Sequence, residues 1–203
     1  MYPRTKQLFS FPILIIMKTL RLICTYECNR NCQGCCNKQD LFLEDNLKSI
    51  DEEDIKNVIN DYHQVLITGG EPMLFQTRVA VLLARIRVAS CIDVILYTAK
   101  TDWSLDGFLN QLAPLDGITI TLHDQRAADE FCNLFEGLMD FNVTHLINEK
   151  SLRLNVFNGV NLDLNLIKYI RMMWLIKNNI EWIPDCPLPS NEKILKLSRP
   201  WKT

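Results

Sequence analysis

The chain has 203 residues, of which 48% are hydrophobic, and its formal net charge is −2. That length and apolar content suffice for one domain with a substantial core, and no linker rich in glycine, serine or proline divides it. The nearly balanced charge, without a basic stripe, gives no indication of a nucleic-acid or membrane-surface protein.

The first residues faintly resemble a signal peptide, because Arg4 and Lys6 precede a mostly apolar run. That run contains Pro12, no small-residue cleavage site follows it, and it is too short to span a bilayer. Met17 is an alternative start, which makes 1–16 an N-terminal extension of little functional weight and 17–203 a single domain. We expect a cytoplasmic protein without a membrane partner.

From residue 19 onwards the hydrophobic pattern alternates between the period of strands and that of helices. Apolar or alternating runs predict strands, and apolar residues three and four apart predict helices. Ser49 and Glu52 form the capping-box pattern that begins a helix. In chain order we predict strand 19–26, helix 55–62, strand 64–68, helix 79–86, strand 93–98, helix 105–112, strand 117–123, helix 131–138, strand 152–157, helix 164–177 and strand 180–183.

Strands that alternate with helices predict βαβ units and therefore an α/β fold with a parallel sheet. Right-handed crossovers wind successive units the same way round, and five or six units do not close an eight-stranded barrel. The expected architecture is a partial (β/α)5–6 barrel, an open curved parallel sheet with helices on its outer face. The proline-containing segment from about residue 184 predicts a C-terminal tail packed on the surface, and residues 182–189 are expected to close the open side of the sheet.

The most informative pattern is a group of cysteines after the first predicted strand. Cys28, Cys32 and Cys35 have the spacing Cys-x3-Cys-x2-Cys, whereas a fully ligated cubane cluster takes four cysteines. Three thiolates leave the fourth iron open for another molecule, and an open metal position distinguishes a reactive site from a structural one. The same spacing would place three thiols on one face of a helix, but the two asparagines and the glycine between them favour a loop.

Two other interpretations of the eight cysteines remain open. A disulfide framework is one, although a chain of this length does not need such staples. A structural zinc site is the other, because thiolates suit zinc as well as iron–sulfur clusters, and it needs a fourth protein ligand. The candidates for that fourth ligand are Cys24, Cys36 and Cys186.

A second motif, Gly69-Gly70-Glu71-Pro72, follows the predicted strand 64–68. Two glycines allow backbone groups to approach a ligand without a Cβ in the way. Ligands in parallel α/β folds bind at the carboxyl ends of strands, where this motif and the cysteine loop both lie. The later strands end near Thr98, His123 and Asn155, although His123 could equally be an ordinary surface or core histidine.

Cys-x3-Cys-x2-Cys after the first strand, with Gly-Gly-Glu-Pro after the second, resembles the radical S-adenosylmethionine (SAM) superfamily. The resemblance covers residues 19–182 in architecture. It implies that Cys28, Cys32 and Cys35 ligate a [4Fe–4S] cluster whose open iron binds the amino and carboxylate groups of SAM. Residues 69–71 would meet the methionyl amine, with Pro72 shaping the turn. One electron would then cleave the sulfonium, and a 5′-deoxyadenosyl radical would take hydrogen from the substrate.

The resemblance also implies further site residues and partners. Thr98, His123 and Asn155 occupy strand ends where this family places groups that contact SAM. A one-electron donor such as a flavodoxin or ferredoxin is required. The run 32–37 partly resembles the activating enzymes of anaerobic ribonucleotide reductases, which implies a glycyl-radical protein as partner. Gly34 departs from the family pattern, because an aromatic residue usually precedes the third cysteine.

The expected function is an enzyme that cleaves SAM reductively and abstracts hydrogen from an unidentified substrate. That substrate is a glycyl-radical partner protein in one version and a small metabolite or modified nucleobase in another. A non-catalytic metal-binding module is the remaining alternative. No second group of closely spaced cysteines occurs near the C-terminus, which indicates a single cluster.

Overall fold

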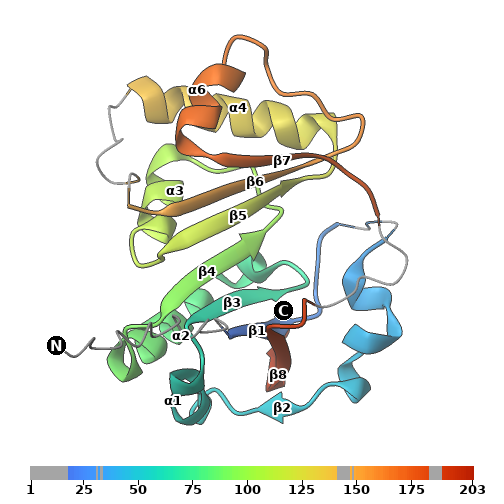
Figure 1. The fold of residues 1–203 in the computed structure, drawn as a ribbon, viewed down its shortest axis with the longest axis vertical. Helices are drawn as coiled ribbons and strands as arrows, with labels where there is room; N and C mark the ends of the chain where they lie inside the picture. The colour runs from blue at the N-terminus through green and yellow to red at the C-terminus, as the bar shows by residue number, and fades with distance from the viewer. Residues whose placement is uncertain (1–17, 31, 33, 141–146, 148, 183–188) are drawn as a thin grey trace, which may run out of the picture.

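The computed structural model describes residues 18–30, 32, 34–140, 147, 149–182 and 189–203. The strands are β1 Thr19–Thr25, β2 Ser49–Ile50, β3 Gln64–Gly69, β4 Asp93–Thr98, β5 Gly117–Leu122, β6 Ser151–Phe157, β7 Leu175–Ile180 and β8 Glu192–Trp201. They form one eight-stranded sheet in the order β2-β8-β1-β3-β4-β5-β6-β7, and every neighbouring pair is parallel (Figure 1).

Helices cover the outer side of the curved sheet, and β2 and β7 form its two edges, so that the sheet stays open (Figure 1). The helices are α1 Ile55–Val58, α2 Gln76–Ala89, α3 Leu105–Leu112, α4 Gln125–Asp140 and α6 Ile167–Met173, with short 3₁₀ turns between them. The predicted α/β class, with an open parallel sheet, is confirmed. None of the helices in the described part of the chain has the length and hydropathy that a membrane crossing requires.

The main core lies between the sheet and the helices, because strand residues alternate between the two faces of the sheet. In β1, Leu20 and Leu22 are fully buried in this core. Ile23 points to the opposite face, where it packs with Phe42 and Ile194 in a second, smaller cluster. That cluster attaches the segment after the cysteine loop to the inner face of β1 and β8.

The C-terminal segment is a central strand, so the prediction of a surface tail is wrong. β8 lies between β2 and β1 and pairs with both. Leu197 and Trp201 are fully buried, and the Thr25 hydroxyl donates to the Trp201 carbonyl oxygen at 2.7 Å. Prolines favoured a tail when the segment was considered locally, but its partner strand lies at the other end of the chain.

Several predicted boundaries also differ from the structure. Ser49 belongs to β2 and is not a helix cap, because α1 begins only at Ile55. The predicted helix 164–177 ends at Met173, and the last predicted strand begins earlier, as β7. Pairing with β6 decides this boundary, since tertiary context outweighs the helical spacing of the apolar residues.

Candidate functional site

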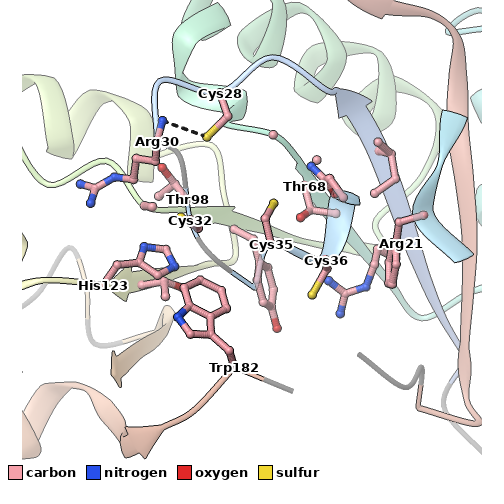
Figure 2. Close-up of a pocket in the computed structure, with 18 of the residues that line it drawn as sticks. Arg21, Cys28, Arg30, Cys32, Cys35, Cys36, Thr68, Thr98, His123 and Trp182 are labelled. Carbon is pink, nitrogen blue, oxygen red and sulfur yellow. Dashed lines mark hydrogen bonds between the residues drawn. The ribbon is translucent and has the colours of Figure 1, made fainter. Parts of the chain in front are cut away.

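A cavity of about 250 Å³ opens at the carboxyl edge of the sheet, where the cysteine loop and the glycine turn meet (Figure 2). Cys28, Cys32 and Cys35 line it, and so do Gly69 and Gly70. The two motifs that were identified separately in the sequence therefore contribute to one site.

The three cysteines lie in irregular backbone, as the turn-forming residues between them predict, and all three are free thiols. The backbone N–H of Arg30 donates to Cys28 Sγ at 3.4 Å (Figure 2). The Lys38 ammonium donates to the carbonyl oxygen of Cys32 at 3.2 Å. These contacts fix the shape of the loop and direct positive charge towards the sulfur atoms.

The neighbouring sulfurs affect the ionisation of Cys28 and Cys32. Burial raises the pKa of the Cys32 thiol, and the neighbouring Cys28 and Cys35 raise it further. Burial also raises the pKa of Cys28, whereas the hydrogen bond from Arg30 lowers it. A metal centre reverses this balance, because its positive charge stabilises the thiolates that ligate it.

The two glycines are required by the contact between the turn and the end of β1. The N–H of Gly70 donates to the Thr25 carbonyl at 2.7 Å, and that of Glu71 donates to the Glu27 carbonyl at 2.8 Å. A Cβ on Gly69, which has φ +134°, would collide with the Thr25 carbonyl oxygen, and one on Gly70 would collide with that of Glu27. The glycine turn therefore docks directly on the backbone that leads into Cys28.

Glu71 holds the turn to the end of β4. Glu71 is buried (3% exposed), and its carboxylate accepts hydrogen bonds from the Thr98 hydroxyl at 2.6 Å, the Ala99 N–H at 2.7 Å and the Met73 N–H at 3.0 Å. Glu71 is not among the residues that line the cavity, and Pro72 is buried at the start of the following 3₁₀ turn. The side chain of Glu71 thus organises the cavity wall from behind.

The predicted residues at the later strand ends have different positions. Thr98 and His123 line the cavity, whereas Asn155 does not and pairs with Thr121 in the sheet. Burial and, to a smaller extent, the Arg30 guanidinium lower the pKa of His123 from 6.5 to about 4, and Asp124 acts in the opposite direction. His123 is therefore neutral at pH 7.

The residues that line the cavity without having been predicted as site residues include Arg21, Tyr97 and Trp182. Trp182 begins the segment 182–189, which was expected to close the open side of the sheet. The Arg21 guanidinium bonds to the Glu192 carboxylate at 2.8 Å and lies 5.4 Å from the centre of the Tyr97 ring. Alternation along a strand puts Arg21 and Tyr97 on the inner face of the sheet, and this pattern could have identified them from the sequence. The sequence alone does not indicate the partner of Arg21, because Glu192 lies in β8, whose pairing with β1 joins segments at opposite ends of the chain.

The comparison with protein families decides what kind of site this is. Residues 20–125, just over half of the chain, match the model of a family described as a 4Fe-4S single cluster domain. The chain belongs to this family of 4Fe–4S single-cluster domains. No curated protein matches the chain significantly. The matched region includes the cysteine loop, the glycine turn, β4 and β5.

The residues of this cluster domain fit a [4Fe–4S] cluster. Three free thiols on one cavity provide the soft donor set that such clusters use. Among the described residues, no three His, Cys, Asp or Glu side chains converge to hold a single metal ion. A cubane has a different requirement, because each cysteine binds a separate iron atom.

The candidates for a fourth zinc ligand do not strengthen the zinc interpretation. Cys24 is fully buried in the core on the helix side of the sheet. Figure 2 shows the sulfur of Cys36 pointing away from that of Cys35. Cys186 lies outside the described residues. Cys36 also lines the cavity, but its sulfur is disulfide-bonded. The cysteines of the cavity that remain as free thiols in the described part of the chain are therefore Cys28, Cys32 and Cys35.

Proposed function

We propose that this protein is a radical SAM enzyme. The observation that supports this proposal best is the shared cavity, which joins three free cysteines to a Gly-Gly turn at the carboxyl edge of a parallel sheet. The family match supports it as well, because domains of this family are found in radical SAM enzymes. When bound, a [4Fe–4S] cluster would supply the electron for reductive cleavage of SAM and for hydrogen abstraction from a substrate.

In this proposal Cys28, Cys32 and Cys35 ligate three irons, and the N–H of Arg30 adjusts the electron density on the first sulfur. Hydrogen bonds to sulfur and burial set the reduction potential of such clusters, so this amide is part of the functional site. The Arg30 side chain bonds to Asp124 at 3.4 Å and so connects the loop to the start of α4.

The glycine turn would hold the methionyl end of SAM through its backbone. The N–H groups of Gly70 and Glu71 already donate to the end of β1, and the Glu71 carboxylate is occupied by three donors. The Glu71 carbonyl oxygen accepts from the Leu74 N–H at 3.1 Å, so the carbonyl oxygens of the two glycines are the groups of the turn that would hold an ammonium group. The carboxylate of Glu71 then acts as a support, and Thr98 lies where it can contact the ligand from the adjacent wall.

A one-electron donor is a necessary partner, because reductive cleavage of a sulfonium consumes an electron. A flavodoxin or a ferredoxin supplies electrons of the required kind. The partial resemblance of residues 32–37 makes a glycyl-radical protein the first hydrogen donor to test, with a small metabolite or modified nucleobase as the alternative. Exclusion of water from the cavity would protect the radical in either case.

Anaerobic reconstitution with iron and sulfide tests the proposal. We expect about four irons and four sulfides per chain, and formation of 5′-deoxyadenosine after addition of dithionite and SAM. Cys32→Ala should abolish both, whereas Cys91→Ser, a change at an exposed free cysteine, should leave them intact. Tight binding of one zinc without uptake of iron, or a cluster that never yields 5′-deoxyadenosine, would refute the enzyme and leave a structural metal-binding module.

A further inference from the structure

Trp182 occupies a position that no motif predicts. It follows β7, lies outside the region matched by the family model, and nevertheless lines the cavity beside the cysteines (Figure 2). Trp182 is 36% exposed, so much of its surface is covered by other residues. The contacts of Trp182 with the cysteine loop and with two strand ends indicate its role.

On one side Trp182 packs against the cysteine loop at Gly34. A Cβ on Gly34 would lie 2.6 Å from the Cβ of Trp182, 2.7 Å from its Cγ and 2.9 Å from its Cδ2. Real Cβ atoms do not approach other atoms so closely, so any side chain at position 34 must displace the tryptophan or the loop. The absence of a side chain at position 34 is therefore matched by the presence of the indole.

Trp182 also packs against two strand ends. Its ring lies 5.3 Å from that of His123 with an interplanar angle of 5°, and 4.3 Å from that of Phe157. His123 and Phe157 are themselves 4.8 Å apart. The three rings come from the ends of β5 and β6 and from the segment after β7, and together they form one aromatic cluster.

We infer that Trp182 is a positioning residue that clamps the cysteine loop to the ends of β5 and β6. Gly34 provides the space, and His123 and Phe157 provide the surface against which the indole is held. The clamp fixes Cys32 and Cys35 relative to the sheet and covers their side of the cavity against water. This inference rests on the proposed function in one respect, namely that the group shielded from water is the cluster. The packing of Trp182 against the cysteine loop does not depend on a bound metal.

Thiol accessibility in the metal-free protein is the first test. We measure the rate at which a thiol reagent modifies Cys32 and Cys35, followed peptide by peptide by mass spectrometry. Trp182→Ala should raise both rates at least tenfold, and Trp182→Phe should stay within about threefold of wild type. Tyr169→Ala is the matched control, because this aromatic ring is similarly exposed (39%) but lies on α6. Rates in Trp182→Ala equal to those in Tyr169→Ala would overturn the clamp.

A rearranged pair provides the second test. Gly34→Ala should accelerate modification as Trp182→Ala does, because the added Cβ expels the indole. The double variant Gly34→Phe with Trp182→Ala places an aromatic ring in the same space from the other side, and it should restore rates to within about threefold of wild type. A double variant as reactive as Trp182→Ala alone would refute the matched geometry.

The reconstituted protein separates this inference from the proposed function. Iron release to a chelator should be at least tenfold faster in Trp182→Ala than in wild type. If wild type binds a cluster without cleaving SAM, the enzyme proposal fails while the iron-release comparison still decides the clamp. If Trp182→Ala keeps its iron and its slow thiol modification, the clamp fails while SAM cleavage still decides the enzyme.

Discussion

The glycine turn yields the sharpest prediction, because its tightness can be tested with a single methyl group. In Gly70→Ala the new Cβ would collide with the Glu27 carbonyl oxygen and would lie 2.9 Å from the Tyr26 carbonyl carbon. Both obstacles are backbone atoms, which cannot move aside as the end of a flexible side chain can. The turn must therefore move away from β1.

The cost follows from the contacts that this movement breaks. Two backbone hydrogen bonds, Gly70 to Thr25 and Glu71 to Glu27, are lost or lengthened, and each contributes about 1 kcal/mol net. Overpacking of a rigid site adds about 1–3 kcal/mol. We expect Gly70→Ala to lower the free energy of unfolding by about 3–5 kcal/mol, and to weaken the retention of iron because the turn supports the start of the cysteine loop.

Gly137→Ala is the matched control, since it is the same substitution in a different setting. Gly137 lies in α4, and its nearest neighbour to an added Cβ is Leu105 Cδ2 at 3.9 Å. Alanine is the better helix former, so this variant should gain up to about 1 kcal/mol. Urea unfolding at constant m value measures both changes. A Gly70→Ala variant within 0.5 kcal/mol of wild type (about the range of a neutral surface substitution) would contradict the close-packed turn.

Three further predictions follow from single groups. Glu71→Gln replaces an acceptor by an amide N–H₂ that faces protein donors, so it should cost about 2–3 kcal/mol in urea unfolding; unchanged stability would show that the carboxylate does not hold the turn. Leu197→Ala should cost about 2–5 kcal/mol and Lys193→Ala less than about 0.5, because only the first is buried in β8; equal effects would support a surface tail. The pKa of His123 falls from 6.5 to about 4 on folding, so the unfolded state binds more protons between these values. Stability should drop by about 2–3 kcal/mol as the pH falls from about 6.5 to about 4, and the same titration of His123→Phe should show a smaller drop.

The strands that carry the site were predictable because each has a strong local signal. The run 93–98 was predicted with the same bounds as β4, and 64–68 lacks only the glycine that ends β3. Burial on both faces makes such strands continuous apolar runs between turn residues. Edge and C-terminal strands were not predictable in this way, because β7 and β8 depend on pairing with strands distant in the sequence.

The residues of the site likewise fall into those that local sequence predicts and those that depend on distant partners. Spacing and residue type were enough to identify Cys28, Cys32 and Cys35 and the glycine turn, since ligand chemistry and backbone freedom are properties of the local sequence. The support by Glu71 and the clamp by Trp182 could not be identified, because their partners lie on other strands.

The sequence by itself determined the α/β alternation and the loop of three thiols that follows one strand. Both depend on local features, since the hydrophobic period and the cysteine spacing each involve only a few consecutive residues. What only the tertiary structure decided was which distant groups meet there: β8 beside β1, Glu71 against Thr98, and Trp182 over Gly34. These contacts arise from close packing, which depends on the shapes of side chains and strands that are distant in the sequence and meet only when the chain folds.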